Sequence, residues 1–158
     1  MTYRDATRPG EREVPLPERG DARLVFIGRI RTPFPAREQC PRQGRVDGPV
    51  CRIEIDAPWR DGLKGLEAFE RAEVLYWMHL ARRDLVLQSP RSNGETMGTF
   101  ALRSPVRPNP IATSHVAIVA VGEGWVDVRG LDCVDGTPLL DLKPDRCAFT
   151  PLAPPKES

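Results

Sequence analysis

The chain has 158 residues, of which 40% are hydrophobic and 28% charged, and its formal net charge is only +1. This length and composition predict one globular domain that buries its own core. The near balance of charge excludes a global positive field for nucleic acid, so any such contact needs a local basic patch. The 17 prolines, about twice the usual frequency, favour short elements joined by loops of fixed shape.

The two ends of the chain carry little apolar sequence. Residues 1–21 are rich in charge and proline and are predicted to form a flexible N-terminal arm, and residues 150–158 are predicted to form a C-terminal tail. The start has no apolar signal region, and no apolar run approaches the ~18 residues of a membrane helix. We therefore expect a cytoplasmic protein without membrane contact.

Seven short runs of β-type composition lie between these ends, at 23–32, 50–55, 72–82, 97–102, 113–121, 125–131 and 138–142. Turn residues separate several of them, and VGEG at 121–124 predicts a hairpin. Residues 63–69 place Leu63, Leu66 and Phe69 at helical spacing. Residues 22–149 are therefore expected to fold as a mainly β domain, a single-sheeted β-barrel of about seven short strands with one short helix.

The four cysteines form no CxxC pair, which argues against a zinc ribbon or a redox motif. We interpret Cys40, Cys51, Cys133 and Cys147 as free thiols that pack as small apolar residues. A metal site of four cysteines would require the fold to gather distant residues, and two histidines are too few for a histidine cluster. No metal is therefore expected.

The densest polar cluster is RSPVRPNP at 103–110. Its three prolines fix the backbone repeatedly and hold Arg103, Arg107 and Asn109 in a stiff loop. Guanidinium groups can bind carboxylate or phosphate through two parallel hydrogen bonds. Taken alone, however, a proline-stiffened loop with solvated arginines is the favoured interpretation, because exposed arginines are common.

Three weaker candidates lie elsewhere in the sequence. Arg42 and Gln43 follow the first predicted strand, where they could meet an anion or an amide. His79 lies within a predicted central strand and could bind a ligand or be a core histidine. Asp132 and Asp135 flank a strand end and could accept hydrogen bonds from a ligand, although an Asp-Gly-Thr run is equally typical of a simple turn.

Together these pieces resemble the TsaA-like family of S-adenosylmethionine-dependent methyltransferases. The resemblance covers about residues 23–145 and rests on PRQ (41–43), GLEAFE (65–70), an aromatic strand ending in His79, GTFALRSPVRPNPI (98–111) and LDCVDGTPLLDLKP (131–144). The best-known members of this family methylate N6 of threonylcarbamoyladenosine at position 37 of tRNA. Two departures are that Ala112 replaces the usual glycine after PNPI and that Asp145 replaces a frequent tyrosine.

The resemblance implies a β-barrel, a homodimer and S-adenosyl-L-methionine bound near the subunit interface. Carried over position by position, it implies cofactor contacts at Pro41, Arg42, Gln43, His79, Leu80, Arg103, His115, Leu131, Asp132, Cys133 and Val134. We further expect acceptor contacts from Arg91, Arg107, Asn109 and Lys143. Asp135 or Asp141 is a candidate to take a proton from the acceptor nitrogen.

Three hypotheses for the activity remain open at this stage. The first is methylation of tRNA, in which Arg82, Arg83, Arg91, Arg107, Lys143 and Arg146 would supply local phosphate contacts. The second is methylation of a small molecule on the same barrel. The third is a dimer that binds S-adenosyl-L-methionine without catalysis.

Overall fold

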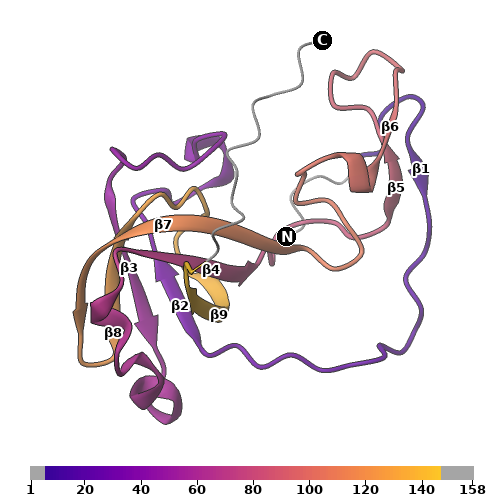
Figure 1. The fold of residues 1–158 in the computed structure, drawn as a ribbon. Helices are drawn as coiled ribbons and strands as arrows, with labels where there is room; N and C mark the ends of the chain where they lie inside the picture. Colours follow the sequence, from indigo (N-terminus) through magenta and orange to yellow (C-terminus); the bar gives the residue numbers. More distant parts are fainter. Residues whose placement is uncertain (1–5, 147–158) are drawn as a thin grey trace.

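The computed structural model describes residues 6–146, which form a closed six-stranded barrel and a three-stranded sheet beside it (Figure 1). Neighbouring barrel strands are antiparallel, in the order β2 (Gly28–Arg31), β3 (Val50–Ile55), β8 (Trp125–Arg129), β7 (Ile111–Gly122), β4 (Arg71–Trp77) and β9 (Thr137–Pro144). The predicted mainly β barrel is confirmed, with six strands in the barrel instead of the seven expected.

The barrel interior is apolar because successive side chains point to opposite faces of each strand. In β3, Ile53 and Ile55 point inward and are buried, whereas Arg52 and Glu54 between and beside them are exposed. Each fully buried aliphatic side chain of this kind contributes about 1.5–3 kcal/mol to folding. The same alternation in β4 brings the polar hydroxyl of Tyr76 inside, where only 2% of the residue is exposed.

β7 has 12 residues, and its two ends pair with different neighbouring strands. Its register with β8 shifts between Ile118 and Ala120, and the intervening Val119 is exposed. Such an irregularity inserts an extra residue and increases the local twist. The strand can therefore pair with β8 at one end and with β4 at the other.

The smaller sheet has the order β1 (Arg12–Glu13), β5 (Leu85–Gln88) and β6 (Met97–Gly98). The predicted strand at 97–102 is wrong beyond Gly98, because η4 (Thr99–Ala101) is a 3-10 turn. The buried Thr99 hydroxyl donates to the carbonyl of Leu85 at 2.8 Å and accepts from the side-chain amide of Gln88 at 2.9 Å. These bonds hold η4 against β5.

Part of the segment expected as a flexible arm is held on this sheet. Arg12 and Glu13 pair with β5 as strand β1. The buried Arg82 donates to the carboxylates of Glu13 at 2.8 Å and Asp84 at 2.7 Å. Composition alone did not predict this, because one charge-assisted network replaces the missing apolar contacts. Residues 1–5 and the expected tail at 150–158 lie outside the described residues.

The predicted helix at 63–69 is helical in the tighter 3-10 form. η2 (Ala57–Leu63) and η3 (Leu66–Ala68) are separated by Lys64 and Gly65, and the φ of 92° at Gly65 is in the left-handed region. Leu63 and Leu66 are both buried. A spacing of three residues keeps side chains aligned on a 3-10 turn, which explains why the pattern resembled two turns of a helix.

The path of the chain joins the two parts of the molecule. The strand predicted at 72–82 ends at Trp77, and the chain then leaves the barrel for β5, β6 and η4 before it returns to β7 (Figure 1). The strand predicted at 23–32 likewise begins only at Gly28. The proline-rich segment at 103–110 is therefore the connection by which the chain returns from the small sheet to the barrel.

Candidate functional site

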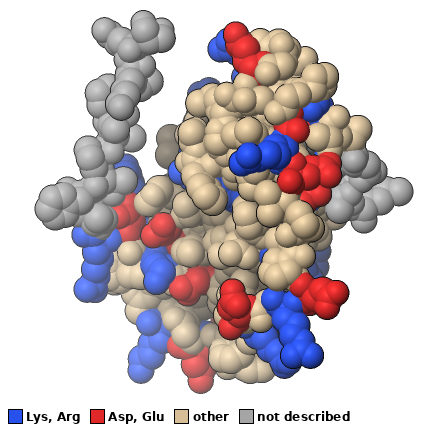
Figure 2. Space-filling view, turned by 90° about the vertical axis from the view of Figure 1, so that its right-hand side faces the viewer, with Lys and Arg blue, Asp and Glu red and all other residues tan. Residues whose placement is uncertain are grey.

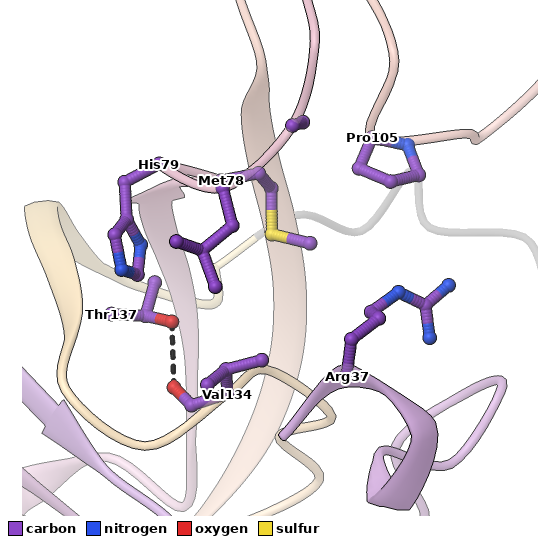
Figure 3. A pocket seen from close by; sticks show the side chains of 8 residues that line it. Arg37, Met78, His79, Pro105, Val134 and Thr137 are labelled. Carbon is purple, nitrogen blue, oxygen red and sulfur yellow. Dashed lines mark hydrogen bonds between the residues drawn. The ribbon is translucent and has the colours of Figure 1, made fainter. Parts of the chain in front are cut away.

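A pocket lies where this return connection meets the end of the barrel (Figure 3). Its walls come from η1 (Arg37–Gln39), the turn after β4, the proline-rich segment and the beginning of β9. The lining residues are Arg37, Met78, His79, Leu80, Ala81, Pro105, Val134 and Thr137. Five of these side chains are apolar, so the pocket suits a ligand with both an apolar and a polar part.

The turn after β4 has a fixed backbone. The amide of Met78 donates to the carbonyl of Pro110 at 2.8 Å, and the amide of Ala81 donates to the carbonyl of Met78 at 3.0 Å. The turn thereby presents His79 to the pocket (Figure 3). Partial burial and the positive charge of Arg29 lower the pKa of His79, so its imidazole is neutral at pH 7.

The proline-rich segment is braced by arginine side chains. Because proline has no amide hydrogen, the segment has few backbone donors of its own. Its carbonyls therefore accept hydrogen bonds from side chains. Arg107 donates from Nη1 to the carbonyls of Leu102 at 3.0 Å and Ser104 at 2.9 Å. Arg83 donates from Nε to the carbonyl of Pro108 at 2.6 Å. Arg107 therefore braces the loop, and the contact with the acceptor that we expect of it stays a prediction.

A second network joins the loop that contains PRQ to the barrel interior. The Tyr76 hydroxyl donates to Oδ1 of Asp132 at 3.0 Å and lies 2.9 Å from Oγ of Ser114. Oδ2 of Asp132 accepts from the amide of Gly44 at 3.2 Å. At Gly44 a Cβ atom would lie 1.7 Å from the carbonyl oxygen of Gly130, so only glycine fits. The PRQ loop is thus docked against the segment that precedes β9.

The positions expected to contact a cofactor fall into several groups. His79, Leu80 and Val134 line the pocket. Pro41, Arg42 and Gln43 are exposed on the docked loop, and Asp132 belongs to the network that holds it. Leu131 and Cys133 are buried in the barrel core.

Two further expected cofactor positions are not among the residues that line the pocket. Arg103 is exposed and donates to the carbonyl of Thr113 at 3.4 Å. His115 is exposed on β7 with Nδ1 3.8 Å from Oδ2 of Asp145, and its neighbour Ser114 contacts Tyr76 instead. Because side chains alternate along a strand, His115 points to the face opposite Ser114.

The candidate proton acceptors are engaged with the protein itself. Oδ1 of Asp135 accepts from the amide of Thr32 at 3.1 Å, which ties the turn before β9 to the end of β2. Oδ2 of Asp141 lies 3.5 Å from Nζ of Lys143 on the same strand. Neither aspartate lines the pocket. The Asp135 side chain therefore holds the turn before β9 against the chain that follows β2, and its role as a proton acceptor stays a prediction.

The remaining acceptor candidates are exposed. Arg91 lies in the loop between β5 and β6, and Lys143 is near the end of β9. Asn109 accepts from Arg83 at 3.3 Å. These residues are therefore spread over the surface rather than gathered at the pocket.

Five residues of the pocket lining were not among the expected site residues: Arg37, Met78, Ala81, Pro105 and Thr137. Pro105 and Thr137 belong to the quoted motifs, but nothing in their type indicated a ligand. Met78 precedes His79 in the strand predicted at 72–82, so its apolar side chain indicated a core residue. Arg37 lies in a segment without periodicity, so its position four residues before PRQ was the only available signal.

Within residues 6–146, no group of three or more His, Cys, Asp or Glu side chains is arranged to hold a metal ion. Cys40, Cys51 and Cys133 are free thiols, and burial raises the pKa of Cys133 to about 12. Cys147 lies outside the described residues. In the same part of the chain, no helix is long and apolar enough to cross a membrane.

Comparison with known proteins identifies the class to which this barrel and its pocket belong. Residues 29–148 match the family model of the tRNA-methyltransferase O N-terminal domain. That match covers more than half of the chain, so the chain belongs to this family. A crystal structure of TrmO from Pseudomonas aeruginosa is similar, with a TM-score of 0.67 and 31% identity over 84% of this chain and 61% of that chain.

Two curated relatives differ in their names and in how much of them this chain covers. The probable S-adenosyl-L-methionine-binding protein VirR of Rhizobium radiobacter is 56% identical over 151 residues, which are 96% of this chain and 86% of that protein. The tRNA (adenine(37)-N6)-methyltransferase of Escherichia coli is 36% identical over 129 residues, 75% of this chain and 55% of that enzyme. The chain thus spans less than two thirds of the length of that enzyme and of the TrmO structure.

Proposed function

We propose that the protein is an S-adenosyl-L-methionine-dependent methyltransferase that methylates N6 of threonylcarbamoyladenosine at position 37 of tRNA. The observation that carries this proposal is the match of residues 29–148 to the tRNA-methyltransferase O N-terminal domain. The E. coli relative named as a tRNA (adenine(37)-N6)-methyltransferase supports the choice of tRNA. The free thiols of the described residues support a reducing, cytoplasmic setting.

The residues of the pocket fit the cofactor. Met78, Leu80 and Pro105 supply apolar surface for a nucleoside, and the cationic Arg37 lies at the same pocket. The neutral His79 adds no positive charge beside a sulfonium group. When bound, S-adenosyl-L-methionine supplies a methyl group that is already activated by its sulfonium charge.

The protein then has to orient the acceptor and remove one proton. Most of the catalytic effect of such a site comes from alignment, for which the braced proline segment and the fixed turn after β4 are suited. Among the lining residues, the imidazole of His79 is the group able to take a proton at neutral pH. Met78, Leu80 and Pro105 would hold the cofactor, which would supply the methyl group, and His79 would take the proton that the acceptor nitrogen gives up.

Contact with tRNA has to be local. On the face drawn in Figure 2, basic and acidic side chains are interspersed. Arg82 is buried against Glu13 and Asp84, and we therefore omit it from the phosphate contacts proposed above. Arg83 and Arg107 donate to backbone carbonyls, so the exposed Arg91, Lys143 and Arg146 are the expected cations that we keep for phosphate.

Homodimer formation is part of the proposal. Phe100 is 85% exposed, and Leu24 and Val25 are 54% and 61% exposed. Among them Phe100 is the most exposed, so it is the side chain that we propose a second copy of the chain covers. Light scattering should give twice the mass of one chain, and Phe100→Asp should shift it toward the monomer. A wild-type protein that is monomeric throughout would contradict this part of the proposal.

The decisive experiment is transfer of a labelled methyl group from S-adenosyl-L-methionine to purified tRNA. Label is expected on tRNA that carries threonylcarbamoyladenosine and not on tRNA that lacks this modification. A metabolite extract is the matched alternative acceptor, and label there instead would identify a small-molecule methyltransferase.

Binding without catalysis is the second candidate, favoured by the name of the 56% identical relative VirR. Calorimetry with S-adenosyl-L-methionine separates the two. Binding with no label on either acceptor would support the second candidate, and no binding would contradict both.

A further inference from the structure

Arg29 is a cation of the outer barrel wall that no carboxylate of residues 6–146 pairs with. It is exposed on β2, where inward and outward side chains alternate. Glu54 faces it across the strand pair, but the Glu54 carboxylate accepts from Nε of Arg31 at 3.0 Å. Within the described chain the Arg29 guanidinium makes one hydrogen bond, from Nη1 to the carbonyl of Gly136 at 3.4 Å. A guanidinium has five N–H donors, so the others can bind a ligand.

The hydrogen bond to Gly136 places Arg29 at the rim of the pocket. Gly136 lies between Val134 and Thr137, and both of these residues line the pocket. The amide of Gly136 donates to the carbonyl of Ile30 at 2.8 Å, which fixes this turn against β2. Most exposed arginines are simply solvated, whereas this one has a fixed position beside a pocket.

His79 lies on the same side of the pocket as Arg29. Figure 3 shows His79 on the side of Thr137, with Arg37 on the other side. After burial, the positive charge of Arg29 is the next cause of the lowered pKa of His79, and such an effect weakens with distance. An acceptor nitrogen that gives its proton to His79 therefore carries its substituents toward Arg29.

We propose that Arg29 binds the carboxylate of the threonyl group that the acceptor adenosine carries on N6. The inference rests on the proposed function and names the residue that selects modified tRNA. The nitrogen that loses its proton to His79 is the one that bears this group, so the carboxylate is tethered a few bonds from the reacting atom. A guanidinium binds a carboxylate through two parallel, charge-assisted hydrogen bonds.

The test compares two forms of an anticodon stem-loop RNA, one with the free threonyl carboxylate and one with that carboxylate converted to the neutral methylamide. Affinity is measured by fluorescence anisotropy at about pH 8, where the imidazole is neutral. The wild type should bind the carboxylate form about 10-fold more tightly, the value expected for one exposed, charged hydrogen-bonded contact. Arg29→Gln should abolish this preference and bind the amide form as the wild type does. Arg29→Lys keeps the charge without the paired donors and should restore part of the preference.

Arg52→Gln is the matched control, since it removes the same charge from the neighbouring strand β3, where Arg52 pairs with Asp127 at 2.7 Å. It should keep the wild-type preference, and thermal melts should confirm that both glutamine variants fold. A wild type that transfers methyl groups to tRNA but binds the two stem-loops equally would overturn this inference alone. A wild type that neither binds the stem-loops nor transfers label would contradict the proposed function and the inference with it.

Three other results would give Arg29 a different role and overturn the inference. Equal loss of affinity for both stem-loops in Arg29→Gln would identify an RNA phosphate as its ligand. Weaker binding of S-adenosyl-L-methionine in calorimetry would identify the carboxylate of the cofactor. Loss of the positive charge should also raise the pKa of His79 and move the acidic limb of methyl transfer to higher pH. That shift with an unchanged preference for the carboxylate form would limit Arg29 to an electrostatic effect on the imidazole.

Discussion

The hydroxyl of Tyr76 donates a 3.0 Å hydrogen bond to the carboxylate of Asp132, and this contact joins the barrel interior to the docked PRQ loop. Burial and the negative charge of Asp132 raise the pKa of Tyr76, which keeps the hydroxyl protonated as a donor. Because the single hydroxyl hydrogen of Tyr76 is donated to Asp132, the hydroxyl of Ser114 is the donor in the 2.9 Å contact with Tyr76. Tyr76 is therefore a positioning residue for the loop that follows η1.

Tyr76→Phe should weaken binding of S-adenosyl-L-methionine by several-fold, because Asp132 would lose one of the two donors that orient it. The cost in the free energy of unfolding should be about 1 kcal/mol, the usual net value of one such bond. Calorimetry and denaturant unfolding measure the two effects. Ser114→Ala is the control, since it removes the other partner of the same hydroxyl and leaves the Asp132 bond intact. Equal affinity in Tyr76→Phe and wild type would refute the positioning role.

Gly44→Ala should displace the PRQ loop, because the new Cβ would lie 1.7 Å from a backbone oxygen of Gly130. We expect a loss of cofactor affinity of at least tenfold, with the strand signal in circular dichroism retained. Gly62→Ala is the matched control, because a Cβ there meets nothing within 4 Å. If both variants bound the cofactor as tightly as the wild type does, the close packing of Gly44 against the Gly130 carbonyl would not be needed for cofactor binding.

Asp135→Asn should retain methyl transfer within about threefold, because an asparagine oxygen can still accept from the amide of Thr32. Asp135→Ala should instead lower the free energy of unfolding by about 1 kcal/mol through loss of that bond. Turnover and unfolding are measured on both variants. A drop of a hundredfold in turnover for Asp135→Asn at normal cofactor binding would restore it as the proton acceptor.

Methyl transfer should fall as the pH decreases through the pKa of His79. That pKa is lowered from its ordinary value of 6.5 by burial and by Arg29, so the acidic limb should lie below pH 6.5. In that window the unfolded chain binds more protons than the folded one, so stability also decreases as the pH falls. His79→Gln should remove this limb from the rate profile and reduce the pH dependence of unfolding. A limb that persists in His79→Gln would exclude His79 as its source.

The barrel was predictable because its strands carry local signals. VCRIEI at β3 alternates between inward and outward residues, and the turn of Gly122 to Gly124 between β7 and β8 has hairpin residues. The small sheet was not predictable, since β5 has four residues and β1 has two. Its stability depends on Arg82, whose partners are set by tertiary structure and not by periodicity.

The site was predictable only through its motifs. Of the cofactor contacts that they imply, His79, Leu80 and Val134 line one pocket, and their contact with the cofactor stays a prediction. They did not distinguish a side chain that faces a ligand from one that holds the loop. Arg107 and Asp132 are examples, because Arg107 donates to backbone carbonyls and Asp132 accepts from the Gly44 amide and the Tyr76 hydroxyl, and the sequence reveals none of these partners. Arg37 was missed because a lone arginine in an irregular segment has no pattern.

The pairing of β2 with β9 has a consequence for synthesis of the chain on the ribosome. Gly28 pairs with Leu139, so the barrel can close only after nearly all of the described residues have been made. Until then β2 and β3 form a hairpin with open edges, which are prone to pair with other chains. Closure between strands so distant in sequence is also slow. We therefore expect nascent chains that stop before β9 to need protection by chaperones, whereas chains released after β9 should fold unaided.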